Sequence, residues 1–102
     1  MSNIVDHIGV PALLEQTAED CCELAQACLK MARKLRDENP TPKSIEDIRD
    51  NLVEEMADVA LCCNELIVDY REINDVFEYK KKRWYERLEQ HVNLDVFEDE
   101  DK

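Results

Sequence analysis

The sequence predicts an all-α fold: an antiparallel pair of long helices followed by a third helix. Only one glycine and three prolines occur among the 102 residues, and they cluster around residues 9–11 and 40–42. Long segments are therefore free of helix breakers. Apolar residues recur at steps of three and four within these segments, which is the period of an amphipathic helix. No run of alternating β-branched residues indicates a strand.

The first helix is predicted to begin at Pro11 and to end near Glu38. Proline suits the first position of a helix, and Pro40 disfavours helical backbone at the residue before it. Residues 1–9 are predicted to be a short lead-in with at most one turn of helix. The apolar residues of the first helix form a heptad-like seam. This first seam consists of Leu14, Ala18, Cys21, Ala25, Cys28, Ala32 and Leu35.

A loop at residues 39–43 separates this helix from the second one. Ser44 is predicted to cap the second helix, which spans about residues 45–73. A third helix is predicted over about residues 75–91, after a break near Asn74. The second seam is Leu52, Met56, Val59, Cys63, Leu66, Tyr70 and Ile73, and the third helix carries a looser stripe of Val76, Phe77, Trp84 and Leu88.

The small side chains of the seams predict association between chains. Alanine and cysteine let helices approach closely but fill little volume, and a domain of this size is marginally stable alone. We therefore expect a homodimer or a dimer of dimers, in which oligomerisation completes a four-helix-bundle core. One helical domain is predicted over residues 1–94, and the acidic residues 95–102 are predicted to be a frayed tail.

Charge and composition exclude several classes of function. A net charge of −12 opposes binding to a nucleic-acid backbone, which requires a basic surface. The sequence has no apolar run long enough for a membrane span and no secretory signal pattern. Five cysteines, in part as two adjacent pairs, match neither a disulfide framework nor a zinc motif. A reduced, cytoplasmic protein without a membrane or nucleic-acid partner is the expectation.

Two acidic clusters, at residues 19–23 and 54–58, are the most informative feature of the sequence. Each places two acids three residues apart, and hence on one face of a helix. These pairs are Asp20 with Glu23, and Glu55 with Asp58. Like charges at this spacing cost a helix about 0.2–0.5 kcal/mol per pair. A hard cation such as Mg²⁺ would offset that cost. The alternative interpretation is that the acids form a solvated face of each helix.

The neighbours of these acids suggest how the two clusters meet. One acid of the first helix belongs to an otherwise apolar row, where an unpaired carboxylate is costly. This row is Leu13, Thr17, Asp20, Leu24, Ala27 and Met31, and the corresponding stripe of the second helix is Asn51, Glu55, Asp58, Cys62 and Glu65. If the two helices pack antiparallel, the clusters face each other and form one carboxylate pocket.

The segments Glu19-Asp20-x-x-Glu23 and Glu55-x-x-Asp58 resemble the EExxE…ExxD signature of the MazG-like, all-α nucleoside triphosphate pyrophosphohydrolases. The resemblance extends over about residues 12–70. It implies a metal-activated water that cleaves a (d)NTP to a (d)NMP and pyrophosphate, with Mg²⁺ as the cofactor and Mn²⁺ as a substitute.

The resemblance also implies roles for individual acids. The metal ligands would be Asp20, Glu23, Glu55 and Asp58, and the catalytic set would be Glu19, Glu23, Glu55 and Asp58. Glu19 would hold a second metal or orient the attacking water. Asp20 departs from the family pattern, because it stands where the family has a glutamate. The interval between Glu23 and Glu55 is also long.

Several side chains are candidates for contacting the nucleotide. Lysine or arginine would bind phosphates, and an amide would hydrogen-bond a base. The candidates are Gln16, Lys30, Arg33, Lys80 and Arg83. For the basic run at residues 80–83, with Arg87, a solvated face or pairing with acids of a neighbouring subunit is an equal alternative. Trp84 and Tyr85 would either stack on a base or belong to the core.

Two other classes of function compete with this one. A non-catalytic helical dimer would serve as an adaptor or regulatory protein, with its acidic faces simply solvated. A di-iron bundle would need Glu-x-x-His motifs on two helices, and the sequence has none. The sequence leaves open the preferred base and sugar, the choice between dimer and tetramer, and the effect of Asp20 on activity.

Overall fold

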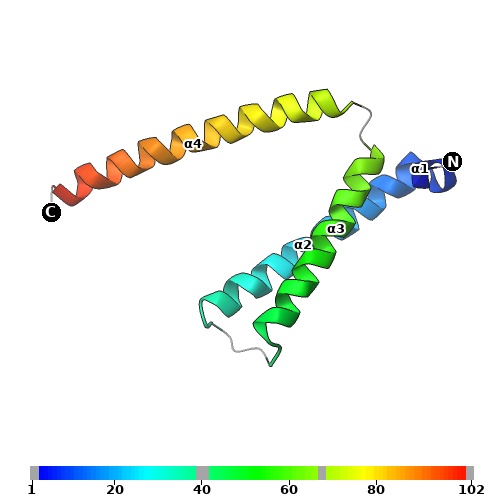
Figure 1. The fold of residues 1–102 in the computed structure, drawn as a ribbon, viewed down its shortest axis with the longest axis horizontal. Coiled ribbons are helices and arrows are strands. Elements are labelled where there is room, and N and C mark those ends of the chain that lie inside the picture. The colour runs from blue at the N-terminus through cyan, green and yellow to red at the C-terminus, as the bar shows by residue number, and fades with distance from the viewer. Residues whose placement is uncertain (1–2, 39–41, 67–68, 101–102) are drawn as a thin grey trace. The chain divides into compact units, whose positions relative to one another are not determined.

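The computed structural model describes the backbone at residues 3–38, 42–66 and 69–100, and the side chains as far as residue 90. Over these ranges the chain is helical and has no strand, which confirms the all-α prediction (Figure 1). The helices are α1 (Ile4–Ile8), α2 (Val10–Leu35), α3 (Ile45–Leu66) and α4 (Tyr70–Glu100). The chain divides into two compact units, residues 1–67 with α1 to α3 and residues 68–102 with α4.

The predicted lead-in contains the short helix α1. Gly9 separates it from α2 with a φ of 85°, a left-handed value that favours glycine. Pro11 then lies in the first turn of α2, as predicted. The backbone N–H of Val5 donates a hydrogen bond of 3.3 Å to Oε1 of Glu65, so α1 is attached to the last turn of α3.

A tight backbone turn ends α2 at Leu35, slightly before the predicted end at Glu38. Asp37 has a φ of 57° and donates through its N–H to the carbonyl of Lys34 at 3.2 Å. The N–H of Glu38 donates to the carbonyl of Arg33 at 2.9 Å. These two bonds form a Schellman motif, which satisfies carbonyls that the helix end leaves without partners. Most of the predicted loop, residues 39–41, lies outside the described residues.

Ser44 caps α3 as predicted, because its Oγ accepts a hydrogen bond from the N–H of Asp47 at 3.1 Å. The predicted end of this helix near residue 73 is wrong. The helix ends at Leu66, and Asp69 caps α4 by accepting the N–H of Arg71 at 2.9 Å. Tyr70 and Ile73 therefore belong to α4. This helix continues to Glu100 and includes residues 95–100 of the predicted tail, whereas 101 and 102 lie outside the described residues.

α2 and α3 lie side by side and run in opposite directions, which is the predicted antiparallel pair (Figure 1). Their contact faces are not the two seams. Among the described residues, those that are buried are Leu13, Asp20 and Ala27 of α2 with Ile48 and Cys62 of α3. All but Ile48 belong to the two rows that carry the acids, and Ile48 lies one turn before Asn51 and Leu52.

Neither the first nor the second seam is buried. Leu14 of the first seam is 52% exposed, and Met56 of the second is 55% exposed. Each seam lies one residue further along its helix than the row that packs, which turns it by about 100°. The hairpin therefore packs through the acid-bearing rows and leaves the first seam largely exposed, while the second seam is half-buried at Leu52, Val59 and Leu66.

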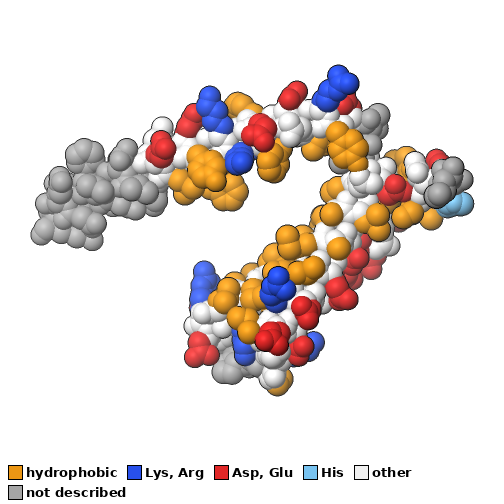
Figure 2. All heavy atoms as spheres, in the orientation of Figure 1, with side chains coloured by type: hydrophobic (Ala, Val, Ile, Leu, Met, Phe, Trp, Pro, Cys, Tyr) orange, Lys and Arg blue, Asp and Glu red, His pale blue; other side chains and the backbone are white. Residues whose placement is uncertain are grey.

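Large apolar side chains are also exposed along α4, as the orange side chains in Figure 2 show. They are Tyr70, Ile73, Val76, Phe77, Tyr79, Trp84, Tyr85 and Leu88. One predicted alternative for Trp84 and Tyr85 was a place in the core. Within this chain they are not buried, because they are 69% and 61% exposed. Among the described residues, no helix combines the length and the hydropathy that crossing a membrane requires.

Candidate metal centre

The helix pair brings three of the four predicted metal ligands to one place. Carboxylate oxygens of Asp20, Glu23 and Asp58 all lie within 4.8 Å of one another. The first two are one turn apart on α2, and Asp58 comes from α3. Asp20 is buried, whereas Glu23 and Asp58 are exposed, so the cluster opens to solvent on one side.

Glu55, the fourth predicted ligand, lies on α3 and interacts electrostatically with these three carboxylates, although its oxygens are not among those that lie within 4.8 Å of one another. Its side chain is partly buried, and its Oε2 atom is shielded from solvent without a hydrogen-bond partner. Burial raises the pKa of Glu55, and the nearby carboxylates of Glu23, Asp58 and Asp20 raise it further. A buried oxygen without a partner is costly, and a cation is one group that would satisfy it.

Asp20 differs from the other three acids because the protein itself holds it on both sides. Nε2 of Gln16 donates a hydrogen bond to Oδ1 at 2.9 Å, and Sγ of Cys62 donates to Oδ2 at 3.2 Å. Gln16 is one turn away on α2, whereas Cys62 lies on α3. Sequence spacing assigned Cys62 to the acidic stripe of α3, but no function was predicted for it.

Positive side chains do not neutralise this cluster. Within the described part of the chain, no lysine or arginine pairs with the four carboxylates, and the ion pair at 4.0 Å joins Arg49 to Asp50 elsewhere on α3. Carboxylate oxygens from two helices, converging without a cationic partner, suit a hard divalent cation such as Mg²⁺. The feature of this site that fits such an ion is Oε2 of Glu55, which is buried and has no hydrogen-bond partner.

The raised pKa of Glu55 predicts how pH affects the metal-free protein. A carboxyl whose pKa is higher in the folded state than in the unfolded state stabilises the fold below its unfolded pKa. This contribution is lost as pH rises through the folded pKa. At neutral pH with a chelator, Glu55→Gln is therefore expected to melt at a higher temperature than the wild type. The difference should narrow as the pH becomes mildly acidic, and melting curves across pH measure it.

Glu54→Gln is the matched control. Glu54 is exposed, and its substitution removes the same charge from the same helix. It should leave the pH dependence of melting unchanged. If Glu55→Gln instead lowered the melting temperature at neutral pH, the Glu55 carboxylate would be a structural group rather than a strained one.

The other predicted site residues lie outside this cluster. Glu19 is exposed on α2 beside Asp20. Lys30 and Arg33 are exposed on α2 between the cluster and the connection to α3. Lys80 and Arg83 belong to α4, in the second unit of the chain. Gln16 contacts the cluster directly, through the bond to Asp20 described above.

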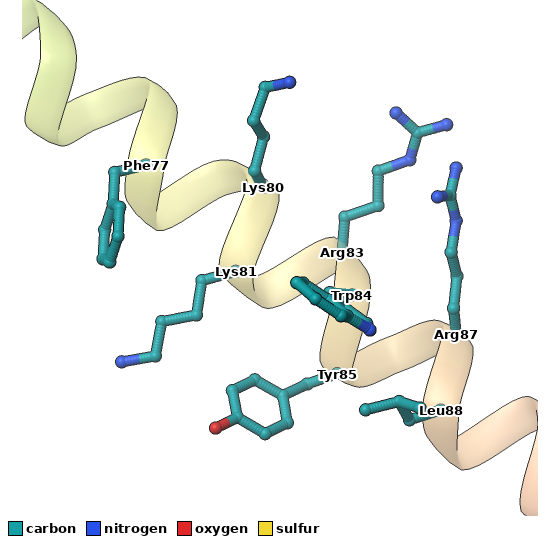
Figure 3. A pocket seen from close by; sticks show the side chains of 8 residues that line it. All are labelled: Phe77, Lys80, Lys81, Arg83, Trp84, Tyr85, Arg87 and Leu88. Carbon is teal, nitrogen blue, oxygen red and sulfur yellow. The ribbon is translucent and has the colours of Figure 1, made fainter. Parts of the chain in front are cut away.

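On α4 the predicted basic run forms part of a mixed basic and aromatic face. Lys80, Arg83 and Arg87 extend to one side of the helix, and Phe77 and Tyr85 extend to another (Figure 3). The pocket on this face has a volume of about 880 Å³. Its lining residues are Phe77, Lys80, Lys81, Arg83, Trp84, Tyr85, Arg87 and Leu88. Because a single helix supplies all of them, another molecule or chain segment is needed to enclose it.

Comparison of the chain with protein-family models gave no match. The curated proteins and the solved structures likewise gave none.

Proposed function

We propose that the protein is a Mg²⁺-dependent nucleotide pyrophosphohydrolase, which converts a (d)NTP and water into a (d)NMP and pyrophosphate. The observation that supports this most is the convergence of the four signature acids from two helices. Three of them place oxygens within 4.8 Å of one another. The fourth, Glu55, interacts electrostatically with these three and carries a buried oxygen without a hydrogen-bond partner.

In the proposed reaction, the oxygen of water bonds to phosphorus, the bond from phosphorus to the pyrophosphate oxygen breaks, and the proton of the water is released. Bound Mg²⁺ would neutralise phosphate charge and acidify water. Asp20, Glu23, Glu55 and Asp58 would hold the ion. Glu19, exposed beside the cluster, is the candidate to hold a second ion or to orient the water.

Electrostatics explains why a metal is needed. A triphosphate carries about four negative charges, and like charges at close range in a partly buried site repel strongly. The cluster could not accept such a substrate without divalent cations. Lys30 and Arg33, on the same helix as Asp20 and Glu23, are proposed to bind outer phosphates.

The test is pyrophosphate release from a panel of NTPs and dNTPs, with and without Mg²⁺. We expect release only with the metal, and the panel would reveal the preferred base and sugar. The double variant Glu55→Gln/Asp58→Asn should lose more than about 100-fold of this activity, because even outer-shell substitutions at metal sites cost about 10–100-fold. Glu54→Gln should retain it. Release that needs no metal, or that survives in the double variant, would refute the proposal.

A second candidate function is a non-catalytic adaptor formed by a helical dimer. The observation that favours it is the exposure of large apolar side chains on both units, including Met56 on the hairpin and Trp84 on α4. Exposed patches of this kind mark interaction sites. A homodimer or a dimer of dimers in the cytoplasm is proposed under either function. Indifference of the folded protein to Mg²⁺, with no release from any nucleotide, would favour the adaptor.

A further inference from the structure

Asp20 is the one acid of the cluster whose position the protein fixes from two helices. It is 7% exposed, and each of its carboxylate oxygens accepts a hydrogen bond from the chain. The bond from Gln16 comes from the preceding turn of α2. The bond from Cys62 crosses from α3, so it also ties the two helices together at the height of the cluster.

Cys62 is suited to this bond by its burial. It is 6% exposed, whereas the other four cysteines of the chain are exposed. A cysteine thiol is a neutral S–H at neutral pH, and an S–H can donate a hydrogen bond to a carboxylate. As a thiolate it would repel Asp20.

The two bonds leave part of the carboxylate free. Two carboxylate oxygens offer about four acceptor positions, and the two donors use one on each oxygen. The remaining positions are available on the side where Glu23 and Asp58 contribute their oxygens within 4.8 Å. Outer hydrogen bonds of this kind fix the orientation of a metal ligand and raise its affinity. An aspartate is short, so its carboxylate depends strongly on such support.

We propose that Cys62 is a positioning residue that, together with Gln16, holds the Asp20 carboxylate in place for a divalent cation. The inference rests on the metal site of the proposed function, and it adds a residue of α3 that does not itself bind the ion. A serine at this position would retain the donor, whereas an alanine would remove it.

The test measures the dissociation constant for Mn²⁺, followed by the electron paramagnetic resonance signal of the free ion, on variants shown to be folded by circular dichroism. Cys62→Ala should weaken binding by about 10–100-fold. Cys62→Ser should restore most of the affinity, because its hydroxyl donates to the same oxygen. Cys63→Ala, at the adjacent exposed cysteine, should bind as the wild type does. If Cys62→Ala weakened binding only through a packing defect, it would lower the stability of the protein, and Cys62→Ser would not restore the affinity for Mn²⁺.

A second readout detects the hydrogen bond without a metal. In a variant whose four exposed cysteines are replaced by serine, Cys62 supplies the only S–H stretching band in the infrared spectrum. Asp20→Ala should shift this band to higher wavenumber, because the thiol loses its acceptor. An unshifted band would show that the bond does not exist in solution, and this would overturn the inference.

The outcomes separate this inference from the proposed function. If the wild type binds Mn²⁺ and Cys62→Ala binds it equally well, only the positioning role fails. If the wild type binds no Mn²⁺, the metal site and the positioning role fail together. If Cys62→Ala does not fold, Gln16→Ala removes the other bond from an exposed side chain, with the exposed Gln26→Ala as its control. Unchanged affinity in Gln16→Ala would then refute the proposal that these hydrogen bonds position Asp20.

Discussion

Near-saturating Mg²⁺ is expected to raise the melting temperature of this protein by about 10–20 °C. An ion that binds only the folded state at about 100 times its dissociation constant adds about 2.7 kcal/mol. In a domain of this size each kcal/mol shifts the melting temperature by about 4–8 °C. The cluster of Asp20, Glu23, Glu55 and Asp58 repels itself when no cation is bound, so the gain includes relief of that repulsion. Thermal unfolding across a Mg²⁺ titration measures it.

Two controls make this result specific. Any salt screens a chain with a net charge of −12, so the comparison requires NaCl at matched ionic strength. Glu55→Gln/Asp58→Asn should lose the response to Mg²⁺ while it keeps the response to NaCl. If the wild type responded equally to both salts, the acids would be a solvated face, and the adaptor would become the better account.

Local sequence chemistry predicted the helical hairpin and the acids that share a face of each helix. The period of the apolar residues identified the helices, and the serine at position 44 marked the start of α3 correctly. The spacing of Asp20 with Glu23 and of Glu55 with Asp58 fixed which side chains share a face. Because the two antiparallel helices pack through the rows that carry these acids, Asp20, Glu23 and Asp58 come together.

The packing faces of the helices were not predictable by the same reasoning. Periodicity favours the most apolar row as the buried one, yet the structure buries the rows that contain Asp20 and Cys62. The pattern of one chain does not say whether a face meets its own hairpin or another molecule. The hydrogen bond from Cys62 to Asp20 depends on the register between two helices, which the sequence spacing within each helix does not contain.

The sequence carries a signal for the early end of α3 in the residue that caps the next helix. Asp69 is a favourable cap residue, and its carboxylate accepts the N–H of Arg71 in the structure. Tyr70 and Ile73 nevertheless continue the three-and-four spacing of the second seam. Apolar spacing alone therefore extends the helix across the true boundary, and a capping residue is the stronger evidence where neither glycine nor proline interrupts the chain.

Ile48→Ala is expected to destabilise the protein by about 2–5 kcal/mol, because it removes a large side chain from one of the few buried positions of the described residues. Ile48 is 3% exposed, and the other buried apolar side chains are Leu13, Ala27 and Cys62. A small domain has a total stability of about 5–15 kcal/mol, so this loss is a large share. Urea denaturation followed by circular dichroism measures it.

Ile45→Ala is the matched control, because it deletes the same atoms from the same helix at a residue that is 45% exposed. It should change stability by no more than about 0.5 kcal/mol. Met56→Ala then tests the exposed seam. It should behave like Ile45→Ala if the chain is a monomer, and like Ile48→Ala if a second copy covers the seam. In the second case, stability would rise with protein concentration. Equal small effects at Ile48 and Ile45 would show that the hairpin does not pack through the acid-bearing faces.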